Sequence, residues 1–177
     1  YLFNPREKTY LLFEKLCGHR LTTFYTRIGG LMRDVGPDFG DEVRALLAAY
    51  RAAVKDVLAL VKRNRIFLDR TVGVCPFTAQ QAVSYGFTGP CLRASGVPYD
   101  VRKARPYYHY DEFDFEIPVG TTGDIYDRLM VRVEEIYQSI RIIEQALDRL
   151  PGGPVNVADK RITLPVKPPI EKAVSDN

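Results

Sequence analysis

The chain has 177 residues, a hydrophobic fraction of 46%, a charged fraction of 27% and a formal net charge of +3. These values are ordinary for one globular domain, and so small a charge gives no indication of nucleic-acid binding. No run approaches the ~18 consecutive apolar residues of a membrane-spanning helix.

The cysteines and histidines lack the spacing of a metal site. Cys17, Cys75 and Cys91 are odd in number, which excludes a complete intrachain disulfide framework. No two of them form a C-x-x-C pair, and neither His19 nor His109 lies in an H-E-x-x-H motif. We therefore expect buried thiols in a reducing compartment and no metal bound by this chain alone.

The first predicted element is a helix that starts at Asn4 and Pro5. Asn4 can cap it, Pro5 suits the first helical position, and Glu7 can return a bond to the cap. We expect this helix to continue to the stop at Gly29 and Gly30. Because the chain has no initial Met and opens almost directly on this helix, we expect it to be a segment of a longer polypeptide.

The second predicted helix covers 39–65, after a turn at Gly36 and Pro37 and a cap at Asp38. Its apolar residues recur at steps of three, four and seven, as in a helix bundle. The charge run Lys62–Arg65 favours a solvated helix end over a ligand site.

The middle of the chain combines a short helix with an irregular segment. Thr78-Ala-Gln-Gln81 has the form of a capping box, and Gly86 ends the helix that it opens. The following residues 85–110 are interrupted by Gly and Pro and carry cations interleaved with tyrosines, which predicts an ordered, irregular loop. Stacking of these tyrosines on nucleic-acid bases is disfavoured by the acidic residues that follow.

The last part contains a predicted strand, a helix and a tail. Residues 113–119 alternate apolar and polar, which indicates an edge strand because Pro118 lacks an amide hydrogen. The strongest helix follows over 124–150, with an apolar stripe that runs from Ile125 to Leu147. From residue 155 the prolines Pro165, Pro168 and Pro169 predict an extended tail. We expect a mainly α fold with a small β element (α+β), divided into 1–154 and 155–177.

No complete catalytic site is evident. The chain has no G-x-S-x-G elbow, P-loop or dinucleotide-binding glycine motif. The acidic cluster Asp111–Glu116 could provide an acid and base pair, but a solvated edge or a set of partners for Arg93–Arg105 is the favoured interpretation.

Read in order, several segments resemble one family, the D-type (49 kDa) subunit of respiratory complex I, the proton-pumping NADH–quinone oxidoreductase. The matching segments are REKTYLLFEKLCGHRLTTFYTRIGG at 6–30, NRIFLDRTVGV at 64–74, GFTGPCLRASGVPYDVRKARPY at 86–107 and IPVGTTGDIYDRLMVRVEEIYQSIRIIEQALDRLPGGP at 117–154. The resemblance covers nearly all of 5–154 and is weaker in the tail.

The resemblance implies a helix bundle like the core of the large subunit of nickel–iron hydrogenases, without the metal. It implies that electrons pass from NADH through iron–sulfur clusters to quinone. The B-type and D-type subunits enclose the quinone headgroup beside the terminal cluster, which the B-type subunit holds. The implied partners are the B-type and C-type peripheral-arm subunits, a membrane-arm subunit and quinone, with no nucleic acid. The implied location is peripheral, on the cytoplasmic side of a bacterial membrane.

The family's quinone-binding His and Tyr, and the Asp that pairs with that His, are expected upstream of position 1. We therefore assign no catalytic residue, and the isolated segment is expected not to reduce quinone. By this resemblance Arg93, Asp100 and Arg102 form an internal ion and hydrogen-bond network.

Two residues are implied to lie near the terminal cluster. Many family members have a His two residues after Arg20, where this chain has Thr22. Threonine does not titrate near neutral pH, so we expect a cluster potential with little pH dependence. This version resembles the form found in menaquinone-using bacteria, which favours menaquinone. Arg27 matches a family cation near the same cluster, and a salt bridge or helix-end cation is its alternative role.

Two other readings compete. A membrane-bound nickel–iron hydrogenase has its first cysteine pair in an R-x-C-G-x-C context, and Arg70–Cys75 is superficially similar, but Val72 stands at the first cysteine position. The other reading is a non-catalytic interaction module. Exposed apolar faces of the isolated segment would favour self-association.

Overall fold

The computed structural model describes residues 1–159 and 161–162 of the chain. These form two compact units, one of Tyr1–Pro5 with Val43–Leu150, the other of Arg6–Glu42 with the chain from Pro151 onward. The elements are α1 (Phe3–Cys17), β1 (Thr26–Arg27), β2 (Gly30–Leu31), α2 (Phe39–Val61), α3 (Arg65–Thr71), α4 (Ala79–Ser84), α5 (Gly89–Ala94), α6 (Val101–Ala104) and α7 (Ile125–Asp148). The mainly α fold with a small β element is confirmed.

None of the helices in the described residues is both long and apolar enough to cross a bilayer. The predicted tail falls largely on residues 160 and 163–177, outside the described part of the chain, and these include Pro165, Pro168 and Pro169.

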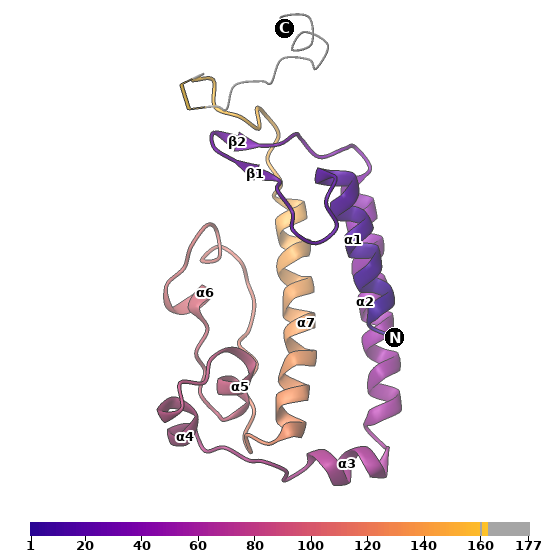
Figure 1. Cartoon of the computed structure of the whole chain (residues 1–177), viewed down its shortest axis with the longest axis vertical. Coiled ribbons are helices and arrows are strands. Elements are labelled where there is room, and N and C mark those ends of the chain that lie inside the picture. Colours follow the sequence, from indigo (N-terminus) through magenta and orange to yellow (C-terminus); the bar gives the residue numbers. More distant parts are fainter. Residues whose placement is uncertain (160, 163–177) are drawn as a thin grey trace, which may run out of the picture. The chain divides into compact units, whose positions relative to one another are not determined.

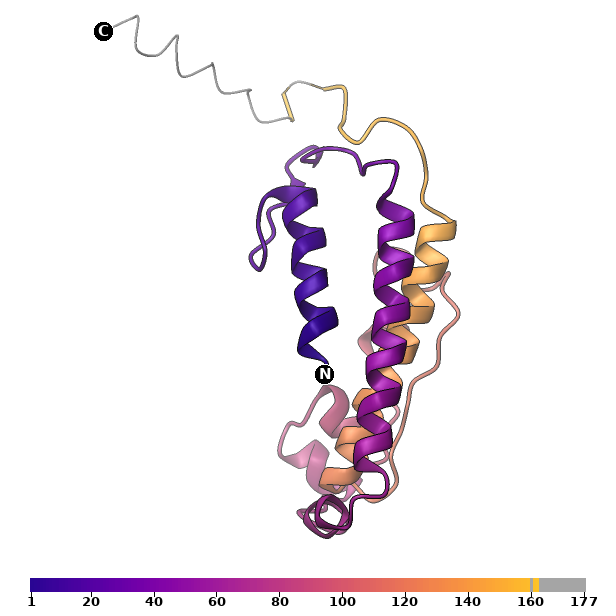
Figure 2. The ribbon, with the colours of Figure 1, turned by 90° about the vertical axis from the view of Figure 1, so that its right-hand side faces the viewer.

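The first unit is built around α7. This helix lies between α2 on one side and the segment that carries α4 to α6 on the other (Figure 1), and α2 and α7 run side by side in both views (Figure 2). Asp124 caps α7 by accepting the Asp127 amide at 2.8 Å, which confirms the start predicted from sequence. Val133 and Ile140 of the predicted stripe are buried, whereas Ile125 and Ile143 are exposed. The core is therefore narrower than the apolar stripe.

The second predicted helix ends earlier than expected. It stops at Val61, and a separate helix, α3, begins at Arg65. Asn64 caps α3, because its side chain accepts the Phe67 amide at 3.2 Å. An asparagine that offers an alternative hydrogen bond ends one helix and starts the next.

The capping box at Thr78 is confirmed, since Thr78 and Gln81 exchange side-chain to backbone hydrogen bonds at the start of α4. The irregular segment after it is only partly irregular. It contains the short helices α5 and α6, and Asp100 caps α6 by accepting the Arg102 amide at 2.9 Å.

The predicted strand at 113–119 is wrong. In the described chain this segment has no strand partner, because the side chains of α7 satisfy its backbone. The amides of Asp114 and Glu116 donate to Gln145 and Gln138, each at 2.9 Å. Phe115 between them is only 1% exposed. The alternating apolar and polar residues therefore belong to an extended segment whose backbone is bonded to side chains of α7 and not to a neighbouring strand.

The first predicted helix is shorter than expected and starts at a different residue. The helix α1 begins at Phe3, so Asn4 lies inside it rather than at the cap, and it ends at Cys17 instead of near Ile28. Gly18 follows with φ +75°, and its amide bonds to the Glu14 carbonyl at 2.8 Å, which closes the helix. Residues 18–31 then form a loop and the β1–β2 hairpin.

Candidate functional site

The candidate site is the loop and hairpin of residues 18–33 in the second unit, which carries both residues implied to lie near a redox centre. Its strands pair antiparallel, with Thr26 opposite Leu31 and Arg27 opposite Gly30. Ile28 and Gly29 make the turn, and Gly29 and the first residue of β2, Gly30, have φ of +89° and +148°. Gly29 and Gly30 were predicted as a helix stop, and the structure shows a hairpin turn instead.

A segment from far along the chain holds this hairpin. The Leu31 amide donates to the Val155 carbonyl at 3.0 Å, and the Val157 amide donates to the Gly29 carbonyl at 2.8 Å. Gly30 and Asn156 form an antiparallel bridge. The edge of a two-stranded hairpin is therefore covered, which such a small element needs to be stable.

The loop that leads into the hairpin is anchored on α1 by Arg20. Its guanidinium bonds to Glu14 at 3.0 Å and also to Glu7. The carboxylates of Glu14 and then Glu7 raise the pKa of Arg20 above its ordinary value. All three side chains are exposed, so this pair of contacts orients the loop more than it stabilises the fold.

The chain that leaves the hairpin is anchored by Arg33. Its guanidinium donates to the carbonyls of Leu16, at 2.7 Å, and Lys15, which are among the otherwise unbonded carbonyls at the end of α1. The hydroxyl of Tyr25 donates to the Arg33 carbonyl at 2.9 Å, and partial burial raises the pKa of Tyr25. Both ends of the loop are thus fixed to the same helix.

Between these anchors, Thr22 and Arg27 are both exposed. The Arg27 guanidinium lies 5.4 Å from the centre of the Phe24 ring, a cation–π distance. Within residues 1–159 and 161–162 no carboxylate pairs with Arg27. Its alternative role as a salt-bridge cation therefore has no support in the described chain, and the helix-end alternative does not apply because Arg27 lies in β1.

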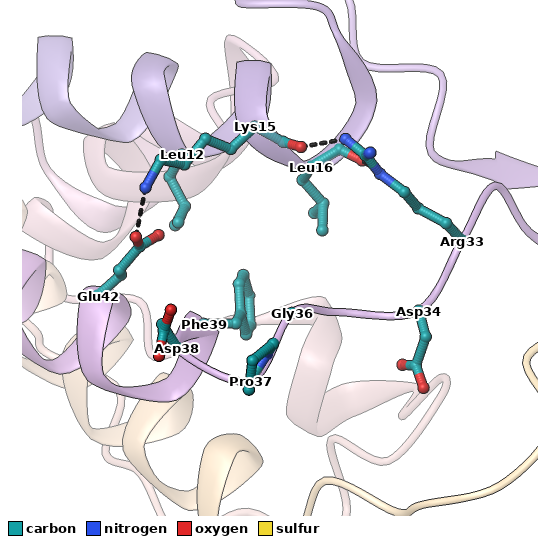
Figure 3. A pocket seen from close by; sticks show the side chains of 10 residues that line it. All are labelled: Leu12, Lys15, Leu16, Arg33, Asp34, Gly36, Pro37, Asp38, Phe39 and Glu42. Atoms are coloured by element: carbon teal, nitrogen blue, oxygen red, sulfur yellow. Dashed lines mark hydrogen bonds and ion pairs between the residues drawn. The ribbon is translucent and has the colours of Figure 1, made fainter.

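Beside the loop lies a pocket of about 300 Å³ (Figure 3). Leu12, Leu16 and Phe39 supply its apolar side chains, and the Lys15–Glu42 ion pair and the Arg33 bond to the Lys15 carbonyl lie at its rim. Sequence reasoning missed Arg33, since nothing in the sequence connects it to a helix that ends well before it. The pocket brings together neither Thr22 nor Arg27.

In the described residues no three His, Cys, Asp or Glu side chains gather in a way that could hold an ion. Cys17 is buried on α1, where its thiol donates to the Phe13 carbonyl at 3.3 Å, while Cys75 is exposed, contrary to the expected burial.

The first unit contains the ion network expected of the irregular segment. Arg93 of α5 bonds to Glu135 of α7, at 2.7 Å from its Nε, and to the Tyr99 carbonyl at 2.9 Å. Arg102 bonds to Asp100 at 2.6 Å, and this guanidinium lowers the pKa of Asp100.

Of the two interpretations favoured for the acidic cluster, the structure fits solvation, since the side chains of Asp114 and Glu112 are 75% and 55% exposed. The carboxylate of Asp114 pairs with Arg141, and that of Glu112 lies 2.9 Å from the His109 ring and 4.0 Å from Arg149. Neither pairs with a cation of Arg93–Arg105.

The model of the family "Respiratory-chain NADH dehydrogenase, 49 Kd subunit" matches residues 1–176. The chain is 53% identical over 167 residues to the NADH-quinone oxidoreductase C/D subunit of Bdellovibrio bacteriovorus, with 94% of the chain and 30% of that protein covered. It is 47% identical to the D subunit of Methylacidiphilum infernorum (94% and 40% covered) and 51% identical to the D 1 subunit of Sorangium cellulosum (94% and 42% covered). The chain thus spans less than half the length of these relatives. It belongs to the family of the 49 kDa subunit of respiratory-chain NADH dehydrogenase.

Proposed function

We propose that the chain is part of the quinone-reducing module of a proton-pumping NADH–quinone oxidoreductase, in which electrons from NADH reach quinone through iron–sulfur clusters. The family match over residues 1–176 and the names of the relatives support this role. They favour it over the hydrogenase alternative, although a helix bundle related to the hydrogenase large subunit remains part of the proposal. The residues of this chain scaffold the site and supply no reacting group.

Within that module, the hairpin faces the terminal iron–sulfur cluster held by the neighbouring B-type subunit. The observation that carries this assignment is Arg27, an exposed cation on an anchored hairpin with no carboxylate partner in the described chain. The cluster supplies one-electron transfer. A fixed cation beside it favours the more negative, reduced state and so raises the reduction potential.

Thr22 has a different consequence at the same site. Its hydroxyl neither takes up nor releases a proton near neutral pH, whereas an imidazole, with a pKa of about 6.5, does both. Thr22 would therefore take up no proton when a cluster beside it is reduced. Menaquinone is the quinone that we assign to this form of the enzyme.

The proposed partners are the B-type and C-type peripheral-arm subunits, a membrane-arm subunit at the quinone site, and quinone. The enzyme is proposed to sit peripherally on the cytoplasmic side of a bacterial membrane. On its own, this segment is proposed to be inactive and to self-associate through faces that its partners cover in the enzyme.

The test is to purify the tagged parent protein from membranes and to measure its partners, its activity and the cluster potential. We expect co-purified subunits, NADH-dependent quinone reduction and a lower cluster potential after Arg27→Gln. The control Lys8→Gln removes an exposed charge from α1 and should leave the potential unchanged. If the enzyme were active and its cluster potential were the same in both variants, Arg27 would not lie beside the cluster. If the purified protein did not reduce quinone, the proposed function would be wrong.

A further inference from the structure

Ion pairs join α2 and α7 along only part of their length. Arg44 pairs with Asp148 at 3.3 Å, and Arg51 forms two bonds to Glu144, at 2.7 and 2.9 Å. The Arg51 guanidinium lowers the pKa of Glu144. In this half of the contact, α7 therefore supplies a carboxylate for each of these α2 cations.

The cations of α2 continue beyond this half without carboxylates. Positions 44, 51, 55 and 62 follow one another at steps of seven, four and seven, so they lie along one side of the helix and the residue that follows it. In the described part of the chain no acidic side chain pairs with Lys55, Lys62 or Arg63. Tyr137 of α7, two turns before Glu144, lies beside these cations instead of a carboxylate.

These cations line a groove of about 440 Å³ within the first unit. Its lining consists of Lys55, Leu58, Ala59, Lys62, Arg63 and Tyr137. The nearby acidic groups do not line it: Asp56 is the neighbour of Lys55 on α2, and Glu134 of α7 accepts the Gln138 side chain at 3.2 Å. The groove thus presents three positive charges around a small aliphatic floor.

We propose that this groove, formed by α2 and α7, docks an acidic peptide segment of another protein chain. The inference rests on the proposed function, because it requires a multisubunit enzyme. An anionic occupant would relieve the mutual repulsion of the three cations. It would also complete the ladder that Asp148 and Glu144 begin.

The dimensions favour a peptide over a single headgroup. Lys55 and Lys62 are separated along the chain by a helical rise of about 10 Å, which two carboxylates on a peptide span and one phosphate does not. Leu58 and Ala59 between them can take an aliphatic side chain of the same peptide. Charge complementarity of this kind sets the orientation and specificity of contacts between subunits.

The first experiment places a photoreactive amino acid at exposed position 59 of the parent protein in the assembled enzyme and identifies the cross-linked peptide by mass spectrometry. We expect a peptide from a different protein chain that has at least two Asp or Glu residues close to the cross-link. A cross-link to phospholipid, to another part of the same polypeptide or to a segment without acidic residues would overturn the proposal. An active enzyme with no cross-link would do so too.

A second variant keeps the test independent of the inserted residue. Lys62→Glu with Arg63→Glu should lower the cross-linking yield at least about threefold, because both attractions become repulsions. The matched control, Lys8→Glu with Arg105→Glu, changes the net charge equally at exposed positions outside the groove and should leave the yield unchanged. Equal yields in the two double variants would contradict docking. A parent protein that purifies without any other subunit would overturn the proposed function together with this inference.

Discussion

The carbonyl oxygen of Val155 lies only 2.2 Å from the position that a Cβ atom on Gly30 would occupy. The backbone of the covering segment therefore reaches the hairpin only because residue 30 has no side chain. This close approach places the Leu31 and Val157 amides at their acceptors. The position of Arg27 on the paired strand therefore depends on the absence of a side chain at Gly30.

Gly30→Ala should separate the covering segment from the hairpin. The clash is with backbone and φ is +148°, so we expect a cost of roughly 1–3 kcal/mol and faster hydrogen exchange at Val157. Gly18→Ala is the control, since it introduces strain at φ +75° with no atom within 4 Å, and it should leave the Val157 amide protected. Unchanged exchange at Val157 in Gly30→Ala would show that this contact does not hold the hairpin.

Glu135→Gln should destabilise the first unit strongly. The Arg93 and Glu135 side chains are only 9% and 18% exposed, so the substitution leaves a largely buried guanidinium without its counter-charge. We expect a loss of about 3 kcal/mol in the free energy of unfolding, measured with urea. Glu144→Gln breaks an exposed pair with Arg51 and should cost less than about 1 kcal/mol. Equal losses in the two variants would contradict a special role for the buried pair.

Asp100→Asn should flatten the loss of stability in acid. The Arg102 guanidinium lowers the pKa of Asp100 in the folded state, so the ionised carboxylate adds stability above its unfolded pKa of about 3.9. That contribution is lost as the pH falls through the folded pKa. Asparagine can still cap α6 but carries no charge.

The measurement for Asp100 is the free energy of unfolding between about pH 6 and pH 3. The unsubstituted chain should lose stability more steeply than Asp100→Asn as the pH falls. Asp56→Asn removes the same charge from an exposed position on α2, and its stability should fall with pH as steeply as that of the unsubstituted chain. If the stability of Asp100→Asn fell with pH as steeply as that of the unsubstituted chain, the pair of Asp100 with Arg102 would contribute nothing to stability in acid.

Local signals predicted the elements whose stabilising contacts are close in sequence. The predicted capping box at Thr78 involves a residue three positions further on, so the sequence contains both partners. The start of α7 was predicted as well, and in the structure Asp124 caps it by bonding to a residue three positions further on. The hairpin and the segment 113–119 depend on distant groups instead. The hairpin is held by its hydrogen bond to Val155, and the segment 113–119 by its hydrogen bonds to the glutamines of α7.

The same distinction applies to the sites. Thr22 and Arg27 were identified through the family resemblance, and the structure adds the anchors at Arg20 and Arg33 that fix their loop. The charge run Lys62–Arg65 was predicted to be a solvated helix end. Lys62 and Arg63 match this prediction, because both are exposed and directly follow the end of α2, although they also line the groove that α7 completes. Arg65 is exposed too, but it begins α3, where it pairs with Asp69 at 3.6 Å.

The most direct test of the account is the pH dependence of the terminal cluster's reduction potential in the assembled enzyme. Between about pH 6 and pH 8 the parent enzyme should show little change, because Thr22 takes up no proton. Thr22→His should introduce a slope that approaches about 59 mV per pH unit, the value for one proton per electron. The same full slope in the parent enzyme, or a flat profile in Thr22→His with the cluster intact, would contradict the placement of this hairpin beside the cluster.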